Sequence, residues 1–156
     1  MNNCEPIEVK RRPRTAVDAQ FSLPYTIACA LVKKRASITD FAEEAIRDPT
    51  ALQIASRIHP FVDQEIEKRA GREISPASVE VRVKTGEVYS AQVLYPKGHP
   101  LNQMTDEDFE SKFRSCTYAA LGDKFSNIID QLIDSLRNLE QINDIIEITR
   151  LFELKV

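Results

Sequence analysis

The hydrophobic periodicity of this chain changes once along its length, and this change limits the folds that are open to it. In residues 79–84, valines alternate with charged residues, which is typical of a half-buried strand. Thr85 and Gly86 can then turn the chain into a second strand over 87–94, so the pattern predicts a β-hairpin. From residue 105 onward the apolar residues recur every three or four positions, as they do on the core-facing side of a helix. The combination predicts an α+β fold with a small antiparallel sheet covered by helices.

Two further strands are expected before the hairpin. Ile7 and Val9 alternate with polar residues over 5–10, which predicts a strand. Residues 58–62 are mainly apolar and predict another, which Pro60 would place near an edge of the sheet. Together with the hairpin, these segments predict a sheet of about four strands.

The segment 15–32 is almost continuously apolar and too long for one strand, so it predicts a buried helix or two short helices in succession. Ser22 can cap the second of these helices, and Pro24 is tolerated in a first turn, where backbone N–H groups have no partner within the helix. A short helix at 39–47, one more helical turn at 50–54, and a loop or frayed helix at 65–75 are expected to follow.

The C-terminal third predicts three helices. Thr105 and Asp108 have the spacing of a capping box at a helix start, and Gly122 can end that helix. Apolar residues at helical spacing over 125–136 and 142–152 predict two more helices. The apolar residues of the last segment spread around the helix, which favours a contact with something beyond this domain.

Length and composition are those of an ordinary globular chain. With 156 residues, of which 42% are hydrophobic, the chain can bury a core. We expect an α+β domain over residues 1–100 and a helical segment over 101–156 that packs on it.

The charge of the chain gives little reason to expect a nucleic-acid partner. The formal net charge is −3, whereas nucleic-acid binding rests on clustered Lys and Arg. The basic run 10–14 is short and contains Pro13, so a solvated linker is favoured over a localisation or nucleic-acid signal. Residues 33–35 follow an apolar run and are typical of a charged helix end.

The three cysteines, Cys4, Cys29 and Cys116, are widely spaced and lack a CxxC pair, so they are expected to be reduced thiols, with Cys29 buried. No window reaches the roughly 18 apolar residues that span a bilayer, and the first residues lack the apolar stretch of a signal peptide. We expect a soluble, cytoplasmic chain with no membrane partner.

Few residues can carry chemistry. The two histidines, His59 and His99, favour structural or surface roles, and the sequence leaves open whether His99 or its loop, 97–104, takes part in a reaction. No metal-binding or nucleotide-binding motif occurs, so no metal and no cofactor are expected. One polar cluster lies inside the otherwise apolar run, at Asp18, Gln20, Ser22 and Tyr25. Its side chains must be hydrogen-bonded by capping or by a ligand, and capping explains Ser22 more easily than Tyr25.

Two motifs resemble one known family. The run Asp18-Ala19-Gln20-Phe21-Ser22-Leu23-Pro24-Tyr25 is similar to the segment that opens the first lid helix of MmgE/PrpD-family lyases. The run Tyr95-Pro96-Lys97-Gly98-His99-Pro100-Leu101-Asn102, continued to Phe109, is similar to the hairpin exit and following helix start of that family. The resemblance covers nearly the whole chain and implies the C-terminal lid domain with its terminal helices.

The family includes 2-methylcitrate dehydratase, cis-aconitate decarboxylase and an iminodisuccinate epimerase, which act on small polycarboxylates without a metal or organic cofactor. The tyrosine of the matching segment faces the active site in family members. The resemblance therefore implies Tyr25 as a catalytic residue, either a hydrogen-bond donor to substrate or a proton-transfer group. Gln20 and Ser22 are weaker candidates for substrate binding.

The resemblance also implies that an N-terminal helical domain, expected to lie outside these 156 residues, supplies most of the catalytic residues and packs against the last helices. Two functions stay open. The chain is the C-terminal part or small subunit of a lyase, inactive alone and completed by a partner chain in a homo- or hetero-oligomer, or it is a non-catalytic fragment or binding module that retains the lid fold. The substrate, and the choice among dehydration, decarboxylation and epimerisation, stay open as well.

Overall fold

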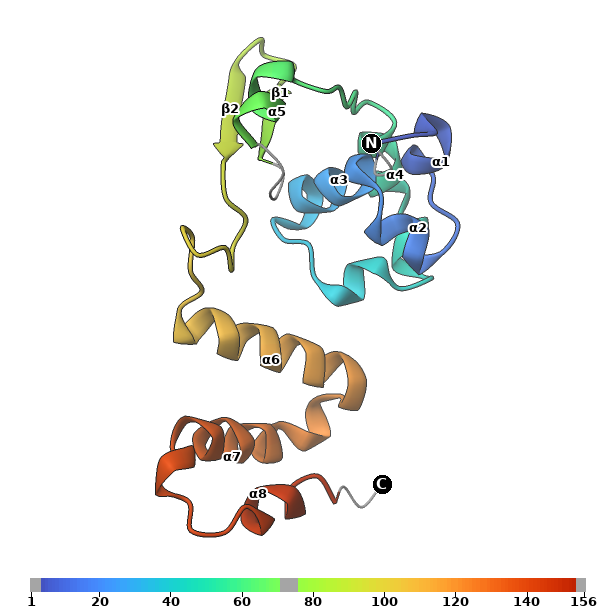
Figure 1. Ribbon diagram of the computed structural model, residues 1–156. Coiled ribbons are helices and arrows are strands. Elements are labelled where there is room, and N and C mark those ends of the chain that lie inside the picture. The colour runs from blue at the N-terminus through green and yellow to red at the C-terminus, as the bar shows by residue number, and fades with distance from the viewer. Residues whose placement is uncertain (1–3, 71–75, 154–156) are drawn as a thin grey trace.

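The computed structural model describes residues 4–70 and 76–153. A group of short helices at the N-terminal end lies beside a β-hairpin, and three further helices follow below them (Figure 1). In chain order the α-helices and strands are α1 (Ile7–Arg11), α2 (Ala16–Gln20), α3 (Leu23–Lys33), α4 (Pro49–Ala55), α5 (Gln64–Ala70), β1 (Ala77–Arg82), β2 (Val88–Val93), α6 (Asp106–Leu121), α7 (Ser126–Arg137) and α8 (Ile146–Arg150). The short 3-10 helices are η1 (Ile38–Phe41), η2 (Ala45–Arg47), η3 (Asp123–Phe125) and η4 (Leu139–Gln141).

The apolar run 15–32 forms two joined helices, α2 and α3, which confirms one of the two predicted arrangements. A capping box starts α2, since the Asp18 N–H donates to Thr15 Oγ1 and the Thr15 N–H donates to the Asp18 carboxylate. Ser22 caps α3 as predicted, because its Oγ accepts the N–H of Tyr25 at 3.0 Å. Pro24 lies in the first turn of α3 and is buried.

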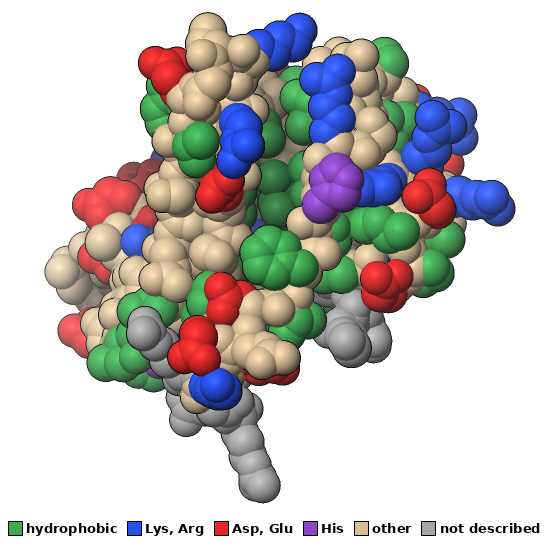
Figure 2. Space-filling model, turned by 90° about the horizontal axis from the view of Figure 1, so that it is seen from above, with side chains coloured by type: hydrophobic (Ala, Val, Ile, Leu, Met, Phe, Trp, Pro, Cys, Tyr) green, Lys and Arg blue, Asp and Glu red, His purple; other side chains and the backbone are tan. Residues whose placement is uncertain are grey.

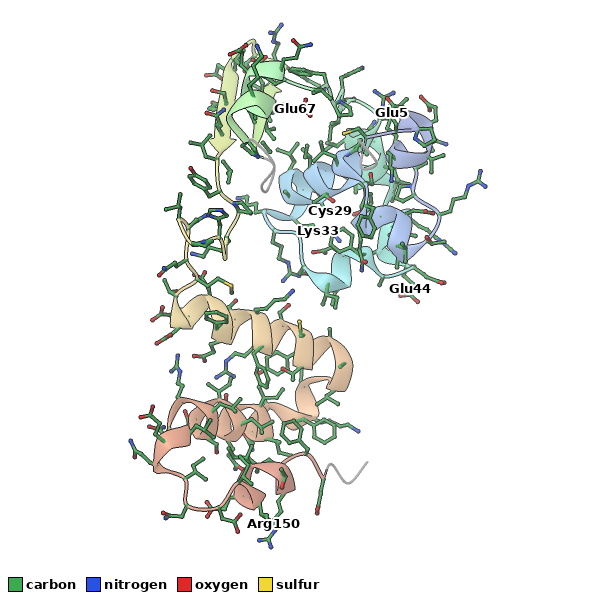
Figure 3. The ribbon with its side chains drawn as sticks, viewed as in Figure 1. Glu5, Cys29, Lys33, Glu44, Glu67 and Arg150 are labelled. Carbon is green, nitrogen blue, oxygen red and sulfur yellow. The ribbon has the colours of Figure 1, made fainter. Side chains whose placement is uncertain are left out.

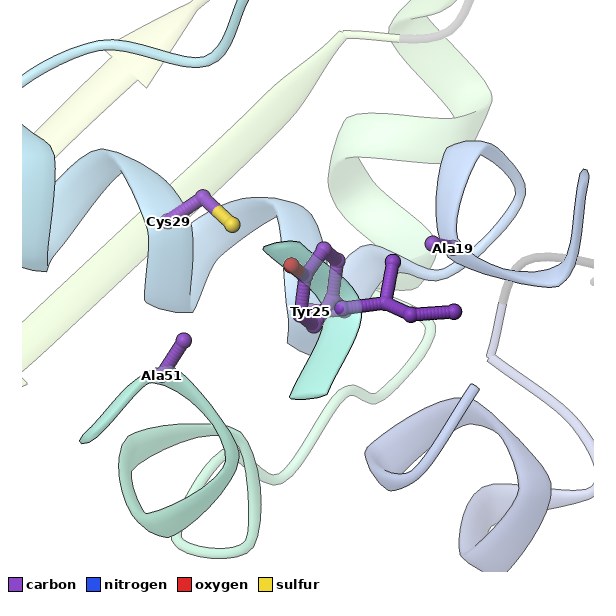
Figure 4. Close-up of a cluster of buried hydrophobic side chains, with 5 residues drawn as sticks. Ala19, Tyr25, Cys29 and Ala51 are labelled. Carbon is purple, nitrogen blue, oxygen red and sulfur yellow. The ribbon is translucent and has the colours of Figure 1, made fainter. Parts of the chain in front are cut away.

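The buried core of this N-terminal group centres on one tyrosine, which packs among smaller side chains (Figure 4). Its buried members are Ala19, Tyr25, Cys29, Ile46 and Ala51. Alanine at positions 19 and 51 lets α2 and α4 approach α3 closely enough to enclose the Tyr25 ring.

The helix predicted over 39–47 is instead two 3-10 turns, η1 and η2. Ile46 of η2 is the residue that enters the core, with 2% of its surface exposed, whereas Ile38 is 47% exposed. Phe41 is half buried and packs against the core. The helical turn expected at 50–54 is α4, which begins where Asp48 Oδ1 accepts the N–H of Thr50.

The strand predicted over 5–10 is wrong, because these residues form the helix α1. The Pro6 carbonyl accepts the N–H groups of Val9 and Lys10, both at 3.1 Å, and so starts a helical turn. Glu8 in the first turn and basic residues in the last turn also suit the helix dipole. An alternation of only two apolar residues is too short to separate a strand from a helix turn.

The strand predicted at 58–62 is also wrong. The Ile58 carbonyl accepts a hydrogen bond from Arg11 Nη2 at 2.8 Å rather than from a neighbouring strand, and Phe61 is 82% exposed. The described residues therefore contain a sheet of two strands instead of about four. The α+β class is confirmed, with helices making up most of the structure.

The predicted hairpin is confirmed. β1 pairs antiparallel with β2 in a register that places Ala77 opposite Val93 and Arg82 opposite Val88. Gly86 turns the chain with φ +96°, a backbone conformation that side-chain-bearing residues rarely adopt. The segment expected to be a loop or frayed helix begins as α5, and its residues 71–75 lie outside the described part of the chain.

The C-terminal third contains the predicted helices. The Thr105 and Asp108 capping box starts α6, and Gly122, with φ +75°, ends it. The helix α7 buries Ile129, Leu132 and Ile133. The third helix, α8, is only five residues long, shorter than the predicted 142–152. Among the helices of residues 4–70 and 76–153, none combines the length and apolar character that crossing a membrane requires.

Candidate functional site

Tyr25 stands in the first turn of α3, where the sequence motif predicted the main candidate. Its side chain is fully buried, with 0% of its surface exposed. The ring packs edge-on against Phe41, with the ring centroids 6.2 Å apart. Tyr25 is therefore enclosed inside the N-terminal group of helices (Figure 4).

The Tyr25 hydroxyl is hydrogen-bonded to the backbone. Its oxygen lies 2.9 Å from the carbonyl oxygen of Asp40 and 3.0 Å from that of Ala45. A hydroxyl has one proton to donate, so the two carbonyls share it. Burial, with a further contribution from the neighbouring Cys29, raises the pKa of Tyr25 well above its ordinary value. The group therefore stays protonated at neutral pH and can act as a donor.

The carboxylate of Asp40 forms the second polar centre of the site. Its Oδ1 accepts a hydrogen bond from Lys33 Nζ at 2.9 Å, and its Oδ2 accepts the N–H and the hydroxyl of Ser37, each at 2.7 Å. Burial opposes ionisation of Asp40, which is only 3% exposed. The hydrogen bonds from Lys33 and Ser37 outweigh that cost and lower the pKa of Asp40 to about 2.

Cys29 and Lys33 follow Tyr25 at one-turn intervals along α3 (Figure 3). Cys29 is buried, as predicted, and burial raises the pKa of its thiol. The hydrogen bond to Asp40 raises the pKa of Lys33. One face of α3 thus carries a hydroxyl, a thiol and an ammonium group in succession.

The two weaker candidates, Ser22 and Gln20, differ in their burial. Ser22 is buried beside Tyr25, and its hydroxyl donates to the Lys10 carbonyl while accepting the Tyr25 N–H. Gln20 is exposed at the end of α2. Substrate contacts by Gln20, Ser22 and Tyr25 stay predictions.

His99 lies in a loop that is folded on itself. Its Nδ1 accepts the N–H of Leu101 at 3.1 Å, and its ring stacks on Tyr95 with the centroids 4.6 Å apart. The Asn102 side chain donates to the Tyr95 carbonyl at 2.8 Å. These contacts hold the His99 ring against its own loop.

The buried polar side-chain groups of the described residues are hydrogen-bonded within the chain. In residues 4–70 and 76–153, every buried side-chain nitrogen or oxygen has a hydrogen-bond partner. Within the same ranges, no three His, Cys, Asp or Glu side chains gather in an arrangement that would hold a metal ion. A shallow surface hollow is lined by Gln64, Glu67 and Lys68 of α5 and includes none of the candidate residues.

The MmgE/PrpD C-terminal domain family matches the chain over residues 3–138. The chain belongs to the MmgE/PrpD family. No curated protein matches it at a significant level.

Within this MmgE/PrpD C-terminal domain, sequence reasoning missed the ion pair that borders Tyr25. Residues 33–35 were expected to be only a charged helix end, yet the Lys33 ammonium group forms an ion pair with the Asp40 carboxylate. Two signals point to the pair: Lys33 shares the helix face of Tyr25, and Ser37 and Asp40 have the spacing of a capping box.

Proposed function

We propose that this chain acts as the C-terminal lid domain of an MmgE/PrpD lyase that converts small polycarboxylates by cofactor-free acid/base chemistry. The observation that carries the proposal is the family match over residues 3–138. Family membership alone does not fix an activity, because function depends on the residues of the site. The proposal therefore assigns the remaining acid/base groups to the family's N-terminal helical domain.

Tyr25 is the residue of this chain that we place at the reaction centre. Dehydration, decarboxylation and epimerisation of polycarboxylates all handle a proton beside a carbon that bears a carboxylate. A tyrosine that stays protonated at neutral pH suits donation to a carboxylate or to a developing enolate oxygen. Its hydroxyl must then leave the carbonyls of Asp40 and Ala45, so the proposal requires η1 and η2 to shift when substrate binds.

The helical domain would dock on the C-terminal helices. Ile145, Ile146 and Phe152 are 59%, 48% and 62% exposed, which is a large apolar surface for such a short segment. Figure 2 views the molecule from above, from the end of the N-terminal helices and the hairpin, where apolar side chains also lie between charged ones. A domain that packs on residues 145–152 would bury these exposed apolar side chains.

Complementation tests the proposal. The chain is mixed with the helical domain of an MmgE/PrpD enzyme supplied as a separate polypeptide, and complex formation is followed by size-exclusion chromatography. Turnover of a panel of small tricarboxylates is followed by proton NMR, with each polypeptide alone as a control. The proposal predicts a complex that turns over at least one substrate, and it fails if no complex forms.

The docking surface is tested in the same mixture. Ile146→Asp places a charge in the apolar surface and is expected to weaken the complex at least about tenfold. Asn143→Asp adds the same charge at a nearby exposed polar position and serves as the matched control. Equal effects of the two substitutions would contradict docking at this surface.

A non-catalytic binding module is the second candidate. The Tyr25 hydroxyl is already hydrogen-bonded within the chain, and every buried polar side-chain atom of the described residues has a partner. The polar groups of such a site have their hydrogen bonds without a ligand. A complex that forms without turnover of any substrate in the panel would favour this second function over the first.

A further inference from the structure

The two faces of the hairpin differ sharply in polarity. On one face the cross-strand pairs are Ala77–Val93, Val79–Ala91 and Val81–Tyr89. The opposite face carries Ser78, Glu80 and Arg82 of β1. The apolar face is incompletely covered, since Tyr89 is 59% and Val93 53% exposed. A two-stranded sheet of this kind gains stability from further strands.

Within the residues that the structure describes, β1 pairs with β2 alone, so its outer edge is hydrogen-bonded to no further strand. The Val83 N–H donates to the Glu87 carbonyl at 3.0 Å, so Val83 and Glu87 form a hydrogen-bonded pair. Hydrogen-bonded pairs alternate along an antiparallel ladder. The backbone N–H and C=O groups of Val79 and Val81 therefore face β2, whereas those of Glu80 and Arg82 face away from it.

The outward groups can pair with a second, antiparallel β1 in only a few registers. One register places Glu80 opposite Glu80 of the second copy, and another places Arg82 opposite Arg82, so both oppose like charges at their centre. The register between them centres on Val81. It places Glu80 opposite Arg82 of the second copy and Arg82 opposite Glu80, which forms two pairs of opposite charge.

The register centred on Val81 also continues the apolar face of the sheet and is compatible with two-fold symmetry. Val81 lies opposite its own copy, and Val79 lies opposite Val83 of the second copy, so the apolar face continues across the junction. The contact is self-complementary, as a two-fold interface must be. The outer edge of β2 presents Val88, Ser90 and Gln92, which carry no charge that could select a register.

We propose that two copies of this chain associate through the outer edges of β1, centred on Val81, to form a continuous four-stranded antiparallel sheet. In the single chain Glu80 and Arg82 are exposed and approach each other to 3.5 Å. In the pair of copies each of these side chains also meets its opposite charge across the junction. The interface is independent of the proposed lyase activity.

Charge-swap variants of the full chain test this register. Glu80→Arg and Arg82→Glu each oppose like charges at both contacts, so each variant alone is expected to associate at least about tenfold more weakly than the native chain. An equimolar mixture of the two variants restores opposite charges at both contacts and is expected to regain dimers. Association is measured by sedimentation velocity over a concentration series, with circular dichroism confirming that each variant is folded.

Glu87→Arg changes the net charge as Glu80→Arg does, but lies in the exposed turn and outside the proposed pairing, so it should leave association unchanged. Amide hydrogen exchange followed by NMR locates the contact. The N–H groups of Glu80 and Arg82 are expected to gain protection as concentration rises, while that of Val81 is already protected by β2.

Three results would overturn the proposal. The native chain could be monomeric at all concentrations, or the mixture of variants could fail to regain dimers. Protection of the Glu80 and Arg82 amides that appears only when the helical domain is added would assign the edge to a partner strand instead of a second copy.

Discussion

The hydroxyl oxygen of Tyr25 lies 2.9 Å from the carbonyl oxygen of Asp40, a residue that also holds the far end of α3 through Lys33. Asp40 thus contacts the same helix at both ends, with its backbone at the first turn and its carboxylate at the last. This arrangement fixes η1 against α3. It also means that any reaction that uses the Tyr25 hydroxyl is coupled to the position of η1.

Removing the Tyr25 hydroxyl should destabilise the fold. Tyr25→Phe removes the hydroxyl donor of the Asp40 carbonyl in a buried place, while the Ala45 carbonyl keeps the N–H of Asp48, and the loss is expected to cost about 1–2 kcal/mol. The free energy of unfolding is measured by urea denaturation. Tyr89→Phe is the matched control, because Tyr89 is 59% exposed, and it should change stability by less than about 0.5 kcal/mol. Equal effects would show that the hydroxyl bonds of Tyr25 contribute nothing.

Stability should depend on the ionisation of Asp40. Its pKa in the folded chain is about 2, below its ordinary value of 3.8, so the ionised form stabilises the fold. This contribution is complete above about pH 5 and is lost as the pH falls through about 2. At neutral pH, Asp40→Asn is therefore expected to cost about 2 kcal/mol.

The difference between the native chain and Asp40→Asn should shrink as the pH is lowered from about 5 to about 2, as measured by urea denaturation at each pH. Asp123→Asn, at an exposed position in η3, serves as the control. A difference that stays constant over this range would contradict an ionised, stabilising Asp40.

Cys29 should be protected from thiol reagents in the folded chain. It is buried and its pKa is raised by burial, so little reactive thiolate is accessible. Cys4 and Cys116 are half buried. Labelling with iodoacetamide, followed by mass spectrometry of peptides, should modify Cys29 more slowly than these two until urea unfolds the chain. Labelling of Cys29 at the rate of Cys116 in the native chain would argue for local opening of α3.

The elements predicted correctly are those whose sequence signals are local and complete. The hairpin has three alternating valines and Gly86 at its turn, and α6 has both members of its capping box, Thr105 and Asp108. These signals determine the backbone without help from distant residues.

The incorrect predictions depended on partners far away in the sequence. Alternation at Ile7 and Val9 predicts a strand only if another strand lies beside it, and Pro6 starts a helix instead. The Ile58 carbonyl is bonded by Arg11, a contact that no local pattern indicates. The hydrogen bonds of Tyr25 to the carbonyls of Asp40 and Ala45 could not be predicted either. Every residue has a backbone carbonyl, so the sequence does not indicate which carbonyl accepts a distant hydroxyl.

The C-terminal helices should depend on the apolar face of α7. Ile129 is 1% exposed, so Ile129→Ala is expected to cost about 2–4 kcal/mol through lost burial and the cavity that remains. Leu136→Ala, at a 47% exposed position of the same helix, is the control and should cost clearly less. Thermal unfolding followed by circular dichroism measures both, and similar midpoints for the two variants would contradict this packing.

We propose that Tyr25 of this C-terminal domain takes part in the chemistry of an assembled MmgE/PrpD lyase. The most direct measurement is kcat for a small polycarboxylate in the complex with the helical domain, compared between the native chain, Tyr25→Phe and Tyr89→Phe under conditions in which all three are folded. Tyr25→Phe is expected to lower kcat at least about a hundredfold, while Tyr89→Phe should retain the native kcat. A complex of Tyr25→Phe that turns over substrate at the native rate would contradict the proposal.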